Sequence, residues 1–260
     1  MPFVQSGDLR MHYEERGTGP ETILFCHGWT GSWMDWTLVM KALPDGFRSI
    51  AVDLRGAGDT DKPASGYTIK QYSDDLYAFC RTLGLRDFTF VGHSMGGGIT
   101  YQFVVDHPEL LKAAAPCGAV GADGYAGWSA EAVADLRANR LNRDYNLANA
   151  RAYYLRPVPE DLLVAGVDQA IKCSDGHVYD SIDSIRDLRL GDRLAQTKVP
   201  MLWMAADRDE AIPLDMVIAD WKRVPGAHLQ VFHGSNHSFQ VEQPAAYAAT
   251  LVDFIRSIPA

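Results

Sequence analysis

The sequence predicts an α/β protein with one mostly parallel sheet covered by helices on both faces. The prediction depends on a repeated alternation of short apolar runs with helical runs, and on one long stretch where that alternation stops. The strand-like runs cover residues 3–5, 9–15, 22–26, 47–52, 88–91, 111–117, 201–205 and 228–232. Strands joined through helices favour parallel pairing, because a crossover connection returns each strand in the same direction.

The first two runs are separated by Gly7-Asp8, a two-residue signal for a β-hairpin turn. Later runs, such as residues 22–26, are apolar without alternation, which suits strands buried on both faces. Helical spacing of apolar residues predicts the core helices, at residues 33–43, 69–83, 95–106, 214–224 and 244–258. Gly84 and the Pro108 region supply stop signals for the second and third of these helices.

Residues 121–197 depart from the alternation of strands and helices, because they contain helical patches and no convincing strand. The patches lie at residues 130–140, 146–154, 159–172 and 179–188. We therefore expect residues 1–120 and 198–260 to form the core domain, and residues 121–197 to form a helical cap subdomain inserted into it.

The amino-acid composition and the net charge limit the classes of function that this chain can have. The chain has 260 residues, of which 47% are apolar and 22% are charged, as is usual for a globular protein. The net charge of −9 argues against nucleic acid or an anionic membrane as a partner. No apolar run approaches the roughly 20 residues of a membrane helix, and no secretory signal is visible. We expect a small-molecule substrate as the partner, with a homodimer left open.

The four cysteines are scattered and form no C-x-x-C pair. This spacing disfavours a zinc knuckle or a redox dithiol and predicts buried free thiols. Free thiols are typical of a reducing compartment, so a cytoplasmic location is expected.

The strongest motif is Gly92-His93-Ser94-Met95-Gly96, which matches G-x-S-x-G between a predicted strand and a predicted helix. A serine at such a sharp turn takes a strained backbone conformation that holds its hydroxyl clear of the sheet. The following helix N-terminus places the Met95 N–H where an oxyanion can form. Ser94 is therefore the candidate nucleophile, and a glycine-rich packing turn is the alternative.

Two further motifs accompany it: His27-Gly28-Trp29 at the end of an earlier strand, and Asp53-Leu54-Arg55-Gly56-Ala57-Gly58-Asp59-Thr60-Asp61-Lys62-Pro63. Together with the serine motif, they resemble the α/β-hydrolase superfamily, whose second stretch reads D-x-R-G-x-G-x-S-x-x-P. Thr60 stands where serine is usual. The resemblance implies the α/β-hydrolase fold with an eight-stranded sheet, and it makes the Trp29 N–H the second oxyanion-hole donor.

The His27 side chain is expected to pin its loop, and residues 53–63 are expected to be scaffold. A metal site built from Asp53, Asp59 and Asp61 is disfavoured, because the segment lacks the EF-hand spacing and its distal glutamate.

The candidate acid follows the strand at residues 201–205, because loops at the carboxyl ends of parallel strands form the site in such sheets. Relatives in the superfamily commonly place the acid four positions before a proline, which selects Asp209 ahead of Pro213. Asp207, Glu210 and, after an earlier strand, Asp123 remain alternatives.

The candidate base is His237, in the loop after the strand at residues 228–232. Ser94, Asp209 and His237 then follow the chain order of the α/β-hydrolase triad. His233 and His237 are four residues apart, but they lie in a predicted loop, so they do not share a helix face for a metal. No metal and no cofactor are expected.

The substrate is expected to contact aromatic and aliphatic side chains from both predicted domains. The candidates are Trp29, Trp33, Tyr125, Trp128, Tyr153, Tyr154, Ile212 and Phe239. Alternatively, the cap aromatics hold the cap to the core. Arg137, Arg140, Arg143, Arg151 and Arg156 are expected on solvated helix faces rather than on a substrate carboxylate.

The leading hypothesis is hydrolysis of a carboxylic ester or lactone of a small to medium, largely apolar substrate through an acyl-enzyme. A cofactor-free carbon–carbon hydrolase of dienoate ring-cleavage products uses the same triad and is one alternative. A ligand receptor built on the hydrolase fold is another. Perhydrolysis, in which peroxide takes the acyl group, also remains open.

Overall fold

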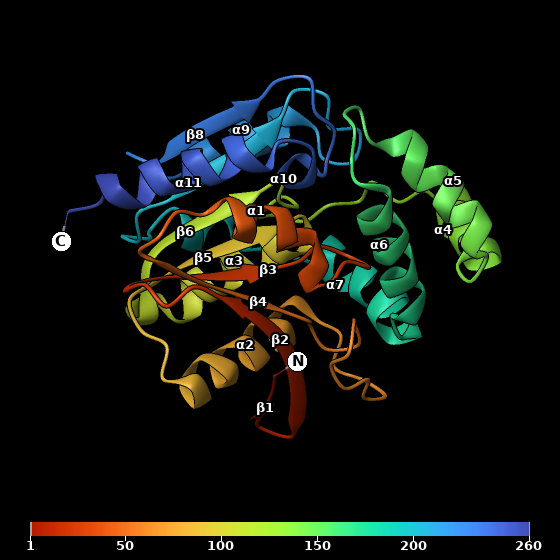
Figure 1. Ribbon diagram of the computed structural model, residues 1–260, viewed down its shortest axis with the longest axis horizontal. Helices are drawn as coiled ribbons and strands as arrows, with labels where there is room; N and C mark the ends of the chain where they lie inside the picture. The colour runs from red at the N-terminus through yellow and green to blue at the C-terminus, as the bar shows by residue number, and fades with distance from the viewer. Residues whose placement is uncertain (1, 260) are drawn as a thin grey trace.

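The computed structural model describes residues 2–259, and its centre is one eight-stranded sheet with strand order β1-β2-β4-β3-β5-β6-β7-β8. The strands are β1 (Phe3–Ser6), β2 (Leu9–Arg16), β3 (Glu21–Cys26), β4 (Phe47–Val52), β5 (Phe88–His93), β6 (Leu111–Cys117), β7 (Leu202–Ala206) and β8 (His228–Phe232). Within residues 2–259, the β1–β2 and β2–β4 pairs are antiparallel and the other five strand pairs are parallel. The mostly parallel eight-stranded sheet predicted from the sequence is therefore confirmed (Figure 1).

The helices follow the predicted order closely. They are η1 (Trp33–Trp36), α1 (Thr37–Ala42), α2 (Ile69–Leu83), α3 (Met95–Asp106), η2 (Pro108–Leu110), α4 (Ala130–Asn139), α5 (Arg143–Tyr153), α6 (Glu160–Lys172), η3 (Gly176–Asp180), α7 (Ser181–Arg186), α8 (Gly191–Leu194), α9 (Leu214–Lys222), α10 (Phe239–Glu242) and α11 (Pro244–Ser257). The helix predicted at residues 33–43 begins as the 3₁₀ turn η1, and a capping box of Ser32 and Asp35 satisfies N–H groups at its start. α5 begins earlier than predicted, because the Asn142 side chain caps it by accepting from Tyr145 N.

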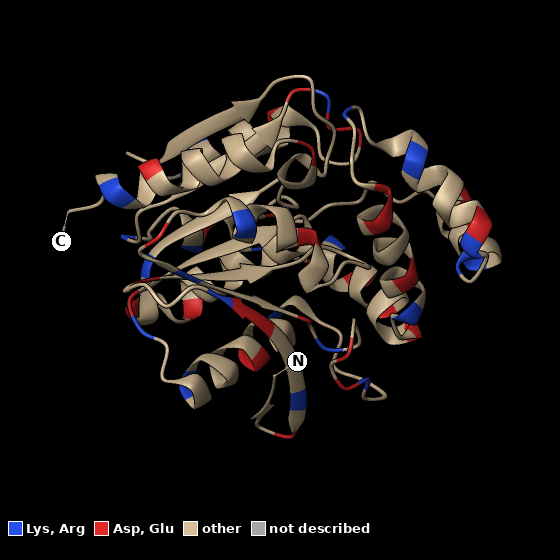
Figure 2. Ribbon diagram, viewed as in Figure 1, with Lys and Arg blue, Asp and Glu red and all other residues tan. Residues whose placement is uncertain are grey.

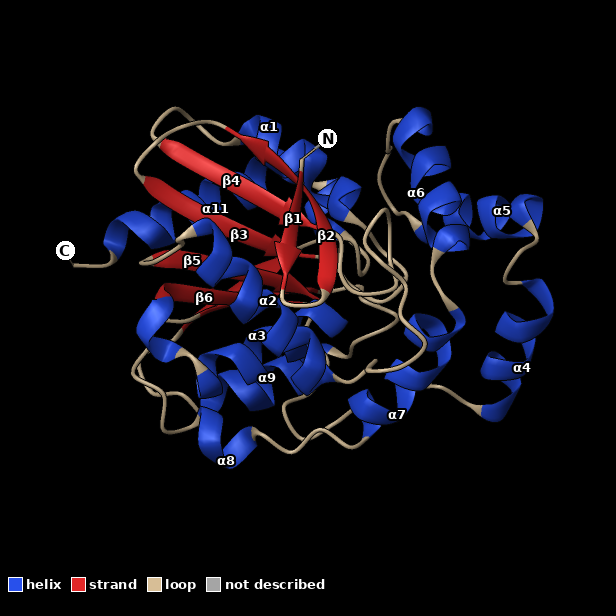
Figure 3. Ribbon diagram, turned by 90° about the horizontal axis from the view of Figure 1, so that it is seen from below, coloured by secondary structure: helices blue, strands red, loops and turns tan. Residues whose placement is uncertain are grey.

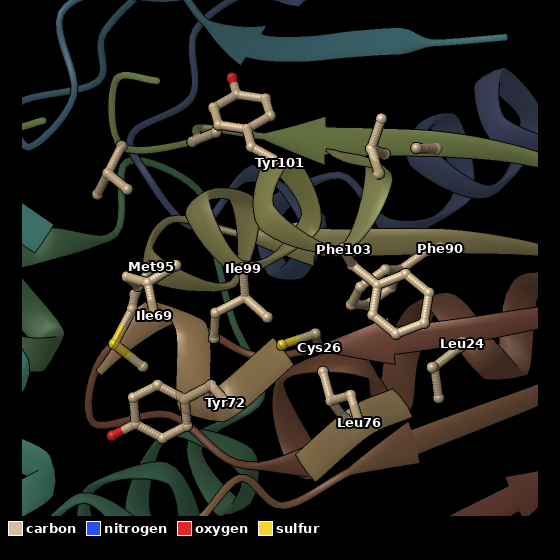
Figure 4. Close-up of a cluster of buried hydrophobic side chains, with 14 of the residues drawn as sticks. Leu24, Cys26, Ile69, Tyr72, Leu76, Phe90, Met95, Ile99, Tyr101 and Phe103 are labelled. Atoms are coloured by element: carbon tan, nitrogen blue, oxygen red, sulfur yellow. The ribbon is translucent and has the colours of Figure 1, made fainter. Parts of the chain in front are cut away.

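Side chains of successive strand residues pack in two different apolar layers, one on each face of the sheet. In β3, Leu24 and Cys26 join the cluster that contains α2 and α3, whereas Ile23 and Phe25 join the cluster that contains α1 and α11. This division follows from the two-residue side-chain period of a strand. Figure 1 shows the sheet between α2 on one side and α11 on the other, and Figure 4 shows the first cluster. Both faces of the sheet are thus covered.

The predicted insertion at residues 121–197 divides into two parts. Helices α4, α5 and α6 stand beyond the end of the sheet in both views (Figures 1 and 3). α5 and α6 have a small apolar cluster of their own, centred on Leu147, Leu163 and Val167. Ile185 of α7 and Leu194 of α8 instead belong to the sheet's own cluster. We refer to residues 130–172 as the α4–α6 segment.

No helix within residues 2–259 is both long and apolar enough to cross a bilayer. Figure 2 shows Lys and Arg distributed over many elements. Cys26, Cys80, Cys117 and Cys173 are buried free thiols, as predicted.

Candidate active site

Ser94 occupies the sharp turn between β5 and α3, with φ of 55° and ψ of −116°. A positive φ is costly for a side-chain-bearing residue, so neighbouring structure must hold it. The Ser94 N–H donates to Cys117 O at 2.9 Å, and the Ser94 carbonyl accepts from Gly97 N at 2.9 Å and from Val120 N at 3.2 Å. Hydrogen bonds from β6 and α3 therefore impose the strained turn.

Two glycines of the serine motif leave room for this turn. A Cβ atom on Gly92 would lie 2.1 Å from Gly96 O, and one on Gly96 would lie 2.5 Å from His27 O. Both contacts are with backbone, which cannot move aside cheaply. The motif therefore brings α3 directly against the end of β3.

His237 contacts Asp209, as the sequence analysis expected of a base and its acid. His237 Nδ1 lies 2.8 Å from Asp209 Oδ2, and Asp209 Oδ1 accepts from Ala211 N at 2.9 Å and Ile212 N at 2.8 Å. These two backbone hydrogen bonds fix the orientation of the carboxylate toward His237. With Nδ1 donating to Asp209, Nε2 of the neutral ring is the acceptor.

The other carboxylates considered from the sequence lie elsewhere. Asp207 accepts from His233 Nδ1 and from Gly234 N on the surface side of the loop. Asp123 pairs with Arg223 at 2.6 Å. Asp209 is therefore the carboxylate in contact with His237.

Ser94 and His237 face one cavity of about 680 Å³. His93, next to Ser94, has its ring centroid 4.5 Å from that of His237. No hydrogen bond joins the Ser94 hydroxyl to His237 within the described chain; such bonds are often long before a substrate binds. The structure thus places Ser94 and His237, which are far apart in the sequence, on the wall of one cavity, and Asp209 contacts His237.

The loop after β3 is held by His27. Its Nε2 accepts from Leu54 N at 3.0 Å, so Nδ1 carries the hydrogen and donates to Gly28 O at 2.7 Å. Burial lowers the pKa of His27, which keeps this neutral tautomer. Because a trans peptide points its N–H away from its carbonyl, the bond to Gly28 O also orients the Trp29 N–H.

The two backbone donors predicted for an oxyanion hole have no protein acceptor. Within residues 2–259, neither Trp29 N nor Met95 N donates to another residue. The Met95 side chain is buried in the core beside Ile69, which leaves only its backbone near the serine (Figure 4). Free N–H groups beside a serine hydroxyl are what stabilisation of an oxyanion requires.

Most of the predicted substrate contacts line the cavity. They are Trp29, Tyr125, Trp128, Tyr153, Tyr154 and Ile212. Trp33 and Phe239 do not, and the prediction is corrected for both. Trp33 turns its backbone N–H to Asp53 and packs beside the α1–α11 cluster. Phe239 is fully buried against Phe232, because α10 presents it to the sheet rather than to the cavity.

Several further residues line the cavity that no sequence motif marks. From η1 come Met34 and Asp35, and from α6 come Leu163, Gly166 and Val167. Asp35 retains some accessible surface, and the cavity is where that surface lies. Burial raises the pKa of Asp35 to about 7, against a smaller opposing effect of the Ser32 N–H.

The arginines of the α4–α6 segment differ from one another. Arg143 and Arg151 form exposed ion pairs, as expected for solvated helix faces. Arg140 lines the cavity, but its guanidinium pairs with Asp175 and donates to Cys173 O. Arg156 donates to the carbonyls of two residues in the loop before His237.

The residues considered for a metal are engaged in other contacts. Asp53 accepts from His12 Nδ1 at 2.7 Å and from Trp33 N at 2.8 Å. Asp61 accepts from Arg10 N. Within residues 2–259, no three His, Cys, Asp or Glu side chains gather in a way that could hold a metal ion.

Comparison with known proteins places this geometry in a family. The family model described as the alpha/beta hydrolase fold matches residues 21–244. A non-heme haloperoxidase from Rhodococcus erythropolis is 29% identical over 275 residues, which cover 99% of this chain and 100% of that protein. An esterase from Exiguobacterium antarcticum shares the fold, with a TM-score of 0.87 at 24% identity over 98% of this chain and 99% of that one. Est816, described as an N-acyl homoserine lactone degrading enzyme, has a TM-score of 0.81 at 26% identity, covering 97% and 100%.

The close approach at Gly96 generates a first prediction. Gly96→Ala should destabilise the fold by about 1–3 kcal/mol, because the new methyl group meets backbone carbonyls. Gly166→Ala is the matched control, since its Cβ would meet nothing within 4 Å and it lies inside a helix. It should stabilise the protein by about 0.5–1 kcal/mol. Urea unfolding measures both, and equal effects of the two substitutions would contradict the steric argument.

The second prediction concerns Asp35 and pH. Its carboxyl titrates near its ordinary value of 3.8 when unfolded but at about 7 when folded. Between these values the folded state binds more protons, so this group lowers the stability as pH rises. Asp35→Asn, which keeps an acceptor for Ser32 N–H, should be more stable than the wild type at pH 8 by up to about 4 kcal/mol. The advantage should shrink at pH 4. Urea unfolding at both pH values checks this, and a difference independent of pH would rule the explanation out.

Proposed function

Because the chain belongs to the α/β-hydrolase fold family, we propose that it is a serine hydrolase that cleaves a carboxylic ester or lactone. The observation that carries the proposal is the hydrogen bond from His237 Nδ1 to Asp209, at the cavity that also holds Ser94. A histidine oriented in this way leaves Nε2 free to take a proton from a serine hydroxyl.

In the proposed reaction, Ser94 Oγ attacks the substrate carbonyl carbon while His237 Nε2 accepts the hydroxyl proton. Asp209 holds the ring in the required tautomer and stabilises the imidazolium that forms. The resulting tetrahedral oxyanion accepts hydrogen bonds from the Trp29 and Met95 N–H groups. Loss of one such donor typically reduces the rate by about 10²–10³-fold.

The tetrahedral intermediate then collapses and expels the alcohol, which receives the proton from His237. For a lactone, the same bond breaks, but the alcohol stays attached to the acyl group. Water, deprotonated by His237, next attacks the acyl-enzyme and releases the carboxylic acid together with free Ser94. The proton balance closes at His237, and no cofactor is needed.

The α4–α6 segment is proposed as a cap over this site. In support, Leu163 and Val167 of α6 line the same cavity as Ser94. A volume of about 680 Å³ lies in the usual range for small-molecule sites. Aromatic walls from Trp29, Trp128 and Tyr153 favour a small to medium, largely apolar substrate.

Perhydrolysis is the second candidate, because the relative from Rhodococcus erythropolis is named a non-heme haloperoxidase. Hydrogen peroxide would replace water in attacking the acyl-enzyme and would release a peracid. The carbon–carbon hydrolase alternative would use Arg140 for a substrate carboxylate. Asp175 and the Cys173 carbonyl already occupy that guanidinium, which favours the ester or lactone substrate.

The third prediction tests the nucleophile. Ser94→Ala should lower kcat/KM for p-nitrophenyl esters by at least about 10³-fold, as the loss of a triad member does elsewhere. A fluorophosphonate should label the wild type once per chain, at Ser94, by mass spectrometry. Ser238→Ala is the matched control, because Ser238 lines the same cavity. Persistent labelling of Ser94→Ala, or hydrolysis by it at the wild-type rate, would reject the assignment.

The fourth prediction tests the acid. Asp209→Asn should reduce kcat by about 10²–10⁴-fold, because the amide favours the wrong tautomer of His237. Asp207→Asn should stay within about threefold of the wild type, since a surface contact of this kind contributes little. The hydrolysis rates of the wild-type protein on esters, lactones and dienoates rank these three substrate classes. A parallel series with added peroxide measures perhydrolysis. An equal loss in the two variants would contradict the role of Asp209.

A further inference from the structure

A buried polar cluster lies behind the His237–Asp209 pair and is not used by the proposed chemistry. Its centre is Asn236, which is 1% exposed, beside Glu242, which is 7% exposed. Both residues are polar, and such groups are costly to bury unless each of their atoms finds a partner. The partners show what the cluster connects.

The Asn236 amide touches three separate chain segments. Its Oδ1 accepts from Glu210 N at 3.0 Å, next to Asp209, and from the His237 N–H at 2.8 Å. Its Nδ2 donates to the Tyr153 carbonyl at 2.9 Å, at the end of α5. One side chain therefore bonds to the loop after β7 that carries Asp209 (the acid loop), to the loop after β8 that carries His237 (the base loop), and to the α4–α6 segment.

Glu242 adds a second connection between the base loop and the same segment. Its Oε2 accepts from Asn236 N at 2.9 Å, and its Oε1 accepts from the N–H groups of Leu155 and Arg156. Those two residues form part of the link between α5 and α6. The carboxylate is satisfied by backbone donors from both sides.

Arg156 completes the contact from the segment's own side. Its Nε donates to Gly234 O at 3.1 Å and its Nη2 donates to His233 O at 2.9 Å. Taken from Tyr153 at the end of α5, the α5–α6 link thus bonds to the base loop directly through Tyr153 and Arg156, and through Leu155 by way of Glu242 of α10. If this link left, Asn236 and Glu242 would lose partners that a buried network needs.

We propose that Asn236 is a positioning residue that couples docking of the α5–α6 link to the geometry of the Asp209–His237 pair. The proposal rests on the proposed hydrolase function for its kinetic consequence, but not for its structural one. When the α5–α6 link is docked, the Asn236 amide has a partner for its Nδ2 as well as for its Oδ1. The amide then holds the backbone of both loops through its hydrogen bonds to Glu210 N and His237 N. The α4–α6 segment would therefore form a wall of the cavity, and its docking would also be required for the correct placement of His237.

The test uses Asn236→Asp, which keeps the oxygen that accepts from Glu210 and His237 but turns a carboxylate oxygen toward the Tyr153 carbonyl. We expect a 10–100-fold fall in kcat for a short ester with KM within about twofold, because small misplacements of catalytic groups are costly. Hydrogen exchange should quicken by about tenfold in peptides that cover residues 153–156, and also in residues 207–212 and 233–238.

Arg151→Ala is the matched control, because it removes an exposed ion pair of the same segment and touches none of the network. It should leave kcat and exchange in the three regions unchanged. Glu242→Gln is the second variant, which serves if Asn236→Asp fails to fold. It should reproduce both effects, because an amide N–H₂ would then face a backbone donor.

Two results would overturn the coupling. One is unchanged exchange at residues 207–212 while residues 153–156 exchange faster. The other is a fall in kcat with no change in exchange at residues 153–156. Failure of the proposed function is separate: wild-type protein that neither hydrolyses esters nor reacts with the fluorophosphonate would reject the hydrolase, and the exchange experiment would still decide the coupling.

Discussion

The strained turn at Ser94 is the constraint on which the rest of the site depends. Its positive φ persists because the end of β6 and the first turn of α3 both bond to it. Those bonds form only if α3 approaches β3 closely, and Gly92 and Gly96 permit that approach. The backbone strain is therefore concentrated at Ser94, where it directs the Ser94 side chain toward the cavity.

Around this turn, buried polar groups are placed by hydrogen bonds rather than by ion pairs. His27 is held neutral between Leu54 N and Gly28 O, and Asp209 is held by two backbone N–H groups besides His237. Hydrogen bonds to backbone thus hold both a neutral histidine and a carboxylate in fixed orientations before any substrate binds. Asp35 differs, because its burial disfavours its charge and leaves an acid facing the cavity.

The α4–α6 segment contributes both to the wall of the cavity and to the contacts of the loop that carries His237. Its helices supply apolar walls, while the α5–α6 link bonds to the base loop through Asn236 and Glu242. Apolar packing alone would allow the segment to slide, whereas directional hydrogen bonds fix its register against His237. The same piece of chain thus lines the cavity and contacts the loop that carries His237.

The sequence by itself determined the mostly parallel sheet and most of the helices, and it proposed Ser94, Asp209 and His237 as candidates, because glycine turns, periodicity and strand ends are local signals. It left open which carboxylate meets His237, and only the tertiary structure placed Asp209 there. It also misplaced Trp33 and Phe239, since the direction of a side chain depends on packing between distant elements. Asp35 and Asn236 carried no motif, because their partners are brought together by folding alone.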